Sequence, residues 1–322
     1  MDECRAAFLR RLRLVGQPLL WDGGVGVALL ERGLDLTKDT PEDWLFCHPE
    51  QVVAVHRGFA QARVQVLQTN TFGLLRNLLL NKRPVHPLTG RPQTVSEQVD
   101  RSVELLLASL PQNLGFGAQA RPYLIGSVGP TGLSALQADA QSQTDSLHEA
   151  FFALAQAFAA NPVDALILET CLDPLELGVA LKAVRAAAPS LPLLVSVTLV
   201  PGCTGLQTPL GVPVKRMLAE LGRNPPDAVG VNCSLDADQM IPAVCEMARF
   251  AGRSSGQLPV IARPQLHRAT KTGFQNTVSP DQFSAGLLRL LSEGATSVGG
   301  CCGVTAAHLE AASRALAANA ER

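Results

Sequence analysis

An alternation of short apolar runs with helix-forming segments constrains this chain more than any other feature of its sequence. Eight apolar runs recur, and several are continuous rather than alternating, as in strands buried on both faces of a parallel sheet. They are Leu19–Trp21, Val64–Leu67, Tyr123–Ile125, Ala165–Leu168, Leu193–Leu199, Ala228–Val231, Pro259–Ala262 and Ser297–Val298. Each run predicts a strand.

Segments with helical periodicity lie between these runs. Asp173 and Ser279 each precede a proline, a combination that favours the start of a helix, and Ser96 is expected to open another. The predicted helices are Glu50–Gln61, Glu97–Leu110, Asp145–Ala159, Leu175–Ala187, Val214–Leu221, Ala237–Phe250, Asp281–Ser292 and Ala306–Ala318. Eight alternations predict an α/β fold, a single-domain (β/α)8 TIM barrel over residues 1–322. A doubly wound open sheet is the alternative.

Composition excludes several classes of function. Charged residues make up 17% of the chain and the net charge is -1, so the dense basic surface of a nucleic-acid-binding protein is missing. No apolar run approaches the ~18 to 20 residues of a membrane span. Arginines interrupt Ala6–Leu14, where a signal peptide would need an apolar segment. We therefore expect a cytoplasmic protein that binds neither nucleic acid nor a membrane.

Polar and glycine-rich words follow the predicted strands. In a TIM barrel the active site lies at the carboxyl ends of the strands. The words found there are DGG (Asp22–Gly24), TNTFG (Thr69–Gly73), GPTG (Gly129–Gly132), ET (Glu169–Thr170), NCS (Asn232–Ser234) and GGCCG (Gly299–Gly303). Random placement would scatter these words over both rims of the barrel. Their coincidence predicts one active site at the carboxyl rim.

Three of the eight cysteines fall on this rim. Eight cysteines are too few for a disulfide scaffold in a chain of this length, so we expect free thiols or metal ligands. Cys233 follows the sixth predicted strand, and the adjacent Cys301 and Cys302 follow the eighth. Three sulfur ligands with one exchangeable position are typical of a catalytic zinc site. The alternative is that Cys233 is a small core residue and the pair lies in a glycine-rich turn.

A zinc site of this kind suits thiol chemistry. A free thiol has a pKa of about 8.5, and zinc deprotonates a thiol that coordinates it. The resulting sulfur is nucleophilic enough to attack an electrophilic methyl group.

Taken in order, the words DGGVG, TNTFG, GPTG, ET, NCS and GGCCG resemble the homocysteine S-methyltransferase domain family over about residues 19–316. The TNTFG word looks more like the homocysteine module of cobalamin-dependent methionine synthase, or betaine-dependent enzymes, than the S-methylmethionine branch. The resemblance implies a TIM barrel that holds Zn²⁺ through Cys233, Cys301 and Cys302. It also implies transfer of a methyl group to the thiol of homocysteine, giving methionine.

The same resemblance implies how homocysteine binds. Glu169 would receive the substrate ammonium with Asp22 nearby, and these two carboxylates are the candidate catalytic residues. The amides of Gly23 and Gly24 would meet the substrate carboxylate. Asn70 either lines the pocket or ties the loop after the second strand. The alternative for Glu169 is a buried ion pair within the barrel.

The acceptor and the donor remain open. Where relatives carry a proline–asparagine word after the seventh strand, this chain reads Pro264–Gln265–Leu266. This departure leaves two alternatives: a methyltransferase for another small thiol, or a non-catalytic barrel that binds a thiol or a corrinoid protein. A hydrolase or lyase that uses Glu169 and Asp22 as acid and base leaves the three cysteines unexplained. The methyl donor is not identified, and a corrinoid, if used, would need a separate partner chain because the barrel leaves no room for a cobalamin domain.

Overall fold

Eight parallel strands form one sheet in the order β1–β12–β9–β8–β5–β4–β3–β2. The computed structural model describes residues 2–14, 16–80, 82, 90–111, 121–133, 140–254, 257–270, 273–276 and 278–320. The strands are β1 (Leu19–Leu20), β2 (Val66–Gln68), β3 (Tyr123–Val128), β4 (Ala165–Cys171), β5 (Leu193–Val197), β8 (Ala228–Asn232), β9 (Val260–Arg263) and β12 (Ser297–Val298). All eight predicted strands are present.

The two ends of this sheet meet each other. A parallel bridge joins Trp21, directly after β1, to Val66 of β2. The Asp22 N–H donates to the Val66 carbonyl at 3.1 Å, and the Gln65 N–H donates to the Leu20 carbonyl at 2.8 Å. The sheet is thus a nearly closed barrel, and the alternative of an open doubly wound sheet is wrong.

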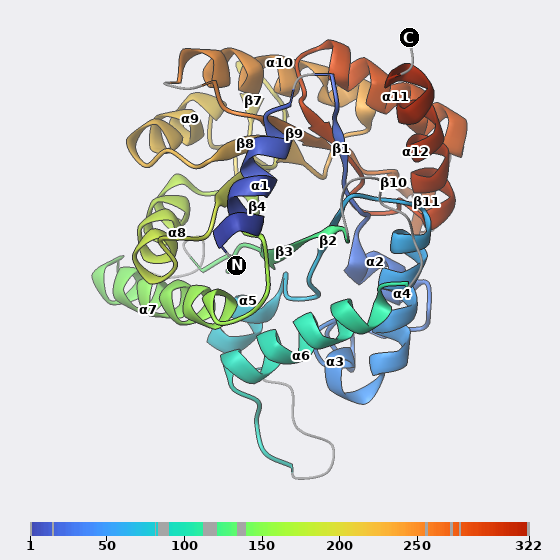
Figure 1. Ribbon diagram of the computed structural model, residues 1–322. Helices are drawn as coiled ribbons and strands as arrows, with labels where there is room; N and C mark the ends of the chain where they lie inside the picture. The colour runs from blue at the N-terminus through green and yellow to red at the C-terminus, as the bar shows by residue number, and fades with distance from the viewer. Residues whose placement is uncertain are drawn as a thin grey trace.

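Helices surround the barrel (Figure 1). All eight predicted helices are present, as α4, α6 to α10 in turn, α11 and α12. The full set is α1 (Asp2–Leu12), α2 (Val25–Leu30), α3 (Trp44–Cys47), α4 (Pro49–Gln61), α5 (Leu74–Leu79), α6 (Val95–Ser109), α7 (Ala140–Ala159), α8 (Pro174–Ala187), α9 (Val214–Arg223), α10 (Ala237–Arg253), α11 (Pro280–Ser292) and α12 (Ala306–Ala320). Among the described residues, no helix combines the length and the apolar character that crossing a membrane requires.

Capping side chains explain where several helices begin. Asp173 and Ser279 cap α8 and α11 as predicted, each accepting a backbone N–H of the first turn. The predicted start at Ser96 is wrong, because Thr94 caps α6 instead. The Thr94 hydroxyl accepts the Glu97 N–H at 3.2 Å, and the Glu97 carboxylate accepts the Thr94 N–H at 2.8 Å. This reciprocal pair satisfies two backbone donors. A helix that began at Ser96 would have Val99 three residues later, which offers no side-chain acceptor for the second bond.

Apolar side chains fill the amino-terminal part of the barrel interior, separately from the larger core between the sheet and the helices. Figure 1 shows α1 lying across the strands near the centre of the view. Its buried side chains Phe8 and Leu12 join an interior cluster with Leu19, Trp21, Val66, Ile125, Ala165, Ile167, Leu194, Ala228 and Ile261. Because side chains alternate between the two faces of a strand, the next inward positions lie toward the carboxyl rim. Helix α1 therefore closes one end of the barrel and leaves the other for chemistry.

Two antiparallel hairpins follow strands at the carboxyl rim. One is β6 (Val200–Gly202) with β7 (Gly205–Gln207) after β5, and the other is β10 (His267–Thr270) with β11 (Gly273–Asn276) after β9. Neither hairpin is predicted from the sequence. In the first, Pro201, Gly202 and Gly205 are more typical of a loop.

The packing of α1 predicts that Phe8→Ala destabilises the barrel. The Phe8 ring is fully buried and its centroid lies 4.9 Å from that of Tyr123. Removing a buried phenylalanine ring costs about 3–5 kcal/mol in free energy of unfolding, measurable by urea denaturation. Leu14→Ala is the control, because Leu14 is 46% exposed and its loss should change stability by less than ~0.5 kcal/mol. Equal effects of the two substitutions would contradict the closing role of α1.

Candidate metal centre

Three cysteine sulfurs converge at the carboxyl rim of the barrel. The Cys233 and Cys302 sulfurs lie 3.8 Å apart, and the Cys301 and Cys302 sulfurs lie 4.0 Å apart. All three sulfurs lie within 4.8 Å of one another. A tetrahedral zinc ion with Zn–S bonds of ~2.3 Å holds its sulfur ligands about 3.8 Å apart. The donor set and its spacing therefore fit zinc.

The first arm of this centre is a strained turn after β8. Cys233 and Ser234 have φ angles of 64° and 58°, in the left-handed region that side chains other than glycine disfavour by roughly 1–2 kcal/mol each. The Cys233 N–H donates to the Arg263 carbonyl at 3.1 Å, and the Cys233 carbonyl accepts the Leu235 N–H at 2.7 Å. These bonds hold the turn, and the turn directs the Cys233 sulfur to the other two.

The second arm is the glycine-rich loop after β12. A Cβ atom on Gly299 would lie 2.4 Å from the Trp21 Cβ, and one on Gly300 would lie 2.5 Å from Val304 Cγ1. Only glycine allows this close approach. The Cys301 N–H then donates to the Pro264 carbonyl at 3.0 Å. The adjacent cysteines are thus fixed against β1 on one side and the loop after β9 on the other.

Hydrogen bonds among the sulfurs set their protonation. Contacts from the Cys301 and Cys302 thiols lower the pKa of Cys233 to about 3. The contact with Cys233 raises the pKa of Cys301 to about 12, and it raises the pKa of Cys302 as well. These directions favour a thiolate at Cys233 that the other two thiols stabilise. A cation that binds all three sulfurs replaces the remaining protons.

Two buried carboxylates and a buried arginine lie beside this cluster. The Glu169 Oε1 accepts the Gln68 Nε2 at 2.9 Å and also the Ser127 hydroxyl. The Glu169 Oε2 accepts the Arg263 Nη1 at 2.9 Å, and the Arg263 Nη2 lies 3.9 Å from the Asp22 Oδ1. When Asp22 is ionised, the two carboxylates and the arginine together carry one net negative charge. The structure thus puts Glu169 in the buried ion pair that was one of its two expected roles.

Asp22 is less completely paired than Glu169. Its Oδ2 accepts the Gln68 N–H at 2.7 Å, whereas its Oδ1 is buried without a hydrogen-bond partner among the described residues. Burial raises the pKa of Asp22 to about 7, and the nearby Arg263 opposes this rise. An unpaired buried carboxylate oxygen is costly, and a bound cationic group would satisfy it.

The remaining predicted residues lie around the same rim with specific partners. The Gly24 N–H donates to the Cys301 carbonyl at 3.1 Å, whereas the Gly23 N–H has no partner among the described residues. The Asn70 amide nitrogen donates to the Pro41 carbonyl at 2.7 Å. The Asn70 side chain therefore ties the loop after β2 to the segment before α3, and its expected role in the pocket stays a prediction.

Sequence reasoning assigned no role to four residues that build this site. Gln68, Ser127 and Arg263 hold the carboxylates, and the Asn232 side chain bonds both the Thr170 N–H at 3.0 Å and the Thr170 hydroxyl at 2.8 Å. Each lies at or near the end of a strand. The alternation of inward positions could have identified Arg263, because it lies two residues after the inward-facing Ile261.

Gln265 lies in the loop after β9, beside the sulfur cluster. Its Oε1 is 3.4 Å from the Cys233 sulfur. An amide oxygen therefore borders the position that a fourth ligand would take.

Other candidate sites lie elsewhere on the molecule. Asp39, Cys47 and His48 form a second group of possible ligands, but Cys47 and His48 are exposed. Partial burial and nearby carboxylates raise the pKa of Cys47 to about 11.

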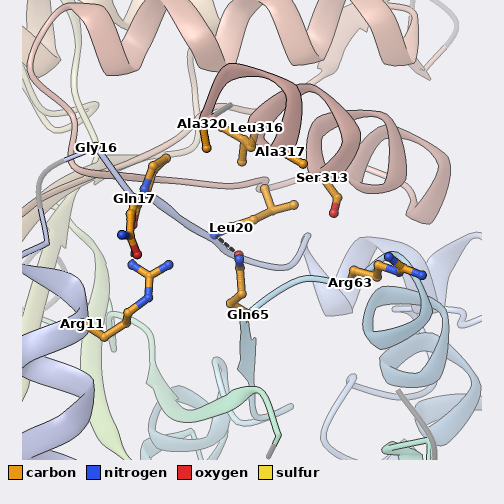
Figure 2. Close-up of a pocket in the computed structure, with 11 residues that line it drawn as sticks. Arg11, Gly16, Gln17, Leu20, Arg63, Gln65, Ser313, Leu316, Ala317 and Ala320 are labelled. Carbon is orange, nitrogen blue, oxygen red and sulfur yellow. Dashed lines mark hydrogen bonds between the residues drawn. The ribbon is translucent and has the colours of Figure 1, made fainter. Parts of the chain in front are cut away.

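Figure 2 shows a cavity of about 580 Å³ at the opposite end of the barrel, between the start of β1 and the end of α12. Arg11 and Gln65 line it, and none of the predicted site residues does.

The chain is similar to known methyltransferases. Residues 19–316 match the family described as homocysteine S-methyltransferase. The chain is 26% identical over 313 residues to methionine synthase of Mycobacterium tuberculosis, a match that covers 93% of this chain and 24% of that protein. It therefore spans about a quarter of the length of that relative. It is 24% identical over 331 residues to betaine–homocysteine S-methyltransferase 1 of Mus musculus, covering 98% of this chain and 76% of that protein.

A solved structure has the same fold. The metallated form of the homocysteine methyltransferase MmuM from Escherichia coli matches with a TM-score of 0.71 and 22% identity, covering 97% of this chain and 99% of that one. The likeness supports the assignment of a TIM barrel. Because the family match covers most of the chain, from the first strand of the barrel into its last helix, the chain belongs to the homocysteine S-methyltransferase family.

Proposed function

We propose that the chain transfers a methyl group to the thiol of homocysteine, giving methionine, at a zinc ion held by Cys233, Cys301 and Cys302. The separation of the three sulfurs carries this proposal, because 3.8 and 4.0 Å suit a tetrahedral ion with one vacancy. The chemistry that zinc supplies when bound is a lowered pKa of the coordinating acceptor thiol. Family membership supports homocysteine as the acceptor.

The buried carboxylates support recognition of an amino acid. Glu169 Oε2 accepts one hydrogen bond and retains a lone pair, and Asp22 Oδ1 has no partner among the described residues. When Asp22 is ionised, these groups and Arg263 together carry one net negative charge, which matches a single substrate ammonium. Since the Gly24 amide is bonded to Cys301, the amide of Gly23 is the donor left for the substrate carboxylate.

The chain's own residues then align the reaction. The ammonium and carboxylate contacts would hold the acceptor with its sulfur near Gln265, at the position that a fourth ligand of a bound ion would take. In the transfer step the acceptor reacts as its thiolate, its proton having passed to solvent: the sulfur forms a bond to the methyl carbon, and the donor–carbon bond breaks with its electron pair going to the donor. Holding both partners in line supplies much of the rate enhancement in such a displacement. The donor is either a small methylated molecule or a methylated corrinoid protein that binds at the rim.

A methyl-transfer assay on zinc-loaded protein tests the proposal. Homocysteine and other small thiols are crossed with S-adenosylmethionine, S-methylmethionine, betaine and a methylated corrinoid protein, and methylated product is measured. We expect methionine from at least one donor and no product after zinc removal. Turnover of another thiol in preference to homocysteine would correct the acceptor. Tight binding of zinc and homocysteine without product from any donor would favour a non-catalytic thiol-binding barrel.

We predict that Cys302→Ser abolishes zinc retention and methyl transfer together. Serine preserves the shape of the loop but removes one of three sulfur ligands. Zinc content after gel filtration and the rate of methionine formation measure the effect. Cys203→Ser is the matched control, because Cys203 is exposed in the turn between β6 and β7, and it should retain both properties. Full activity of the Cys302 variant in metal-free buffer would refute the zinc mechanism.

We predict that Asp22→Asn raises the KM for homocysteine by on the order of 10- to 100-fold, because a hydrogen bond to a charged group contributes about 1.5–3 kcal/mol. The control acceptor is 4-mercaptobutyrate, which lacks the ammonium, and its KM should be unchanged.

The pH dependence provides a second measure of the same contact. Because the pKa of Asp22 is raised to about 7, its carboxylate is protonated below that pH and charged above it. The KM of the wild type for homocysteine should therefore fall as the pH rises through about 7. The ratio of this KM to that for 4-mercaptobutyrate should lose this dependence in Asp22→Asn. Parallel profiles for the two proteins would argue against the ammonium contact.

A further inference from the structure

Arg263 occupies an unusual position beneath the three sulfurs. Of the lysines and arginines whose side chains the structure describes, only Arg263 is buried, at 2% exposure. It ends β9, and its guanidinium carbon lies 5.6 Å from the centroid of the Trp21 ring. A buried cation is costly unless charged and polar partners surround it. The partners of Arg263 therefore indicate its role.

Those partners connect the two arms of the metal centre. The Arg263 carbonyl accepts the Cys233 N–H at 3.1 Å. The Arg263 Nε donates to the carbonyl of Gly300, directly before Cys301, at 3.0 Å. One residue thus joins the strained turn after β8 to the glycine-rich loop after β12. The Arg263 Nη1 donates to the Glu169 Oε2 at 2.9 Å.

The local charge also favours a cation at this position. Zinc with three thiolates carries one net negative charge, and an acceptor thiolate adds another. Asp22 and Glu169 lie in the same buried region. Without Arg263, no lysine or arginine buried in the described part of the chain would offset these charges. Uncompensated buried charge would weaken binding of an anionic acceptor and separate the thiolates.

We propose that Arg263 is the positioning residue of the metal centre: it ties the two cysteine-bearing loops and Glu169 into one unit and offsets the charge of the thiolates. The proposal rests on the proposed zinc function. Arginine suits the role because its planar fork reaches Gly300 and Glu169 at once, whereas a lysine ammonium on a flexible stem reaches one of them. Partners behind the ligands of a metal typically change its affinity by about 10- to 100-fold.

The test is zinc affinity, measured by competition with a chromogenic chelator on purified full-length protein. We expect Arg263→Gln to lower the affinity by about 10- to 100-fold, and Arg263→Lys to lower it less because it keeps the charge. Cobalt(II) reports geometry independently of activity, and its visible absorption bands should shift in both variants. Thermal unfolding checks that each variant folds, and Arg263→Lys keeps the test decisive if the glutamine variant does not.

Arg121→Gln is the matched control. Arg121 forms a two-pronged ion pair with the buried Asp164, at 2.7 and 3.1 Å, near the amino-terminal ends of β3 and β4. Its loss should lower stability without changing zinc affinity. Wild-type affinity in both Arg263 variants, or an equal loss in Arg121→Gln, would overturn the positioning role alone. Wild-type protein that retains no zinc would overturn the proposed function and this inference with it.

Discussion

The junction between the first and the last strand is the constraint on which the rest of this structure depends. Gly299 packs against Trp21 so closely that no side chain fits between them, and the Gly300 N–H donates to the Asp22 carbonyl at 2.9 Å. This contact closes the ring of strands and, in the same few residues, sets the position of Cys301 and Cys302. Fold and metal centre are therefore parts of one arrangement. A barrel that failed to close here would also separate the sulfurs.

The interior of the barrel changes character along its axis. Apolar side chains fill it from α1 upward, whereas Gln68, Ser127, Glu169 and Arg263 form a polar layer beneath the cysteines. Desolvating so many polar groups is unfavourable unless each finds a partner, and nearly all of these do. Two atoms near this layer lack a hydrogen-bond partner among the described residues: the Asp22 Oδ1, and the Oγ of Ser196, which lies two residues after the inward-facing Leu194. A largely paired layer with a vacant carboxylate oxygen suits a site that is rigid before its ligand arrives.

Much of this arrangement is predictable from sequence, because the signals are local. Continuous apolar runs such as Leu193–Leu199 identify buried strands, and the barrel rule then puts the carboxyl-terminal words on one rim. The three cysteines proposed as metal ligands lie together in the structure, as that rule requires. Family resemblance added the substrate roles, which the geometry leaves as proposals.

What was not predictable depends on contacts between distant segments. The Asn70 side chain turns to Pro41, and the Gly24 amide turns to Cys301, because loops that meet only in the folded chain offer those acceptors. In the sequence, Arg263 follows the apolar run Pro259–Ala262, a position typical of the end of a strand. Its partner Glu169 lies 94 residues earlier, so no local pattern indicates the pair.

The packing of α1 limits the routes by which reactants can reach the cysteines. Since Phe8, Leu12 and their neighbours fill the amino-terminal part of the interior, the described residues leave the carboxyl-terminal mouth as the route to the cysteines. Two reactants that reach a site through the same opening bind one after the other. On the proposed function, an acceptor whose ammonium reaches the deep carboxylates would bind first, and the methyl donor would bind above it. The demethylated donor would then leave before the methylated amino acid, so the shape of the barrel would set the order of binding and release.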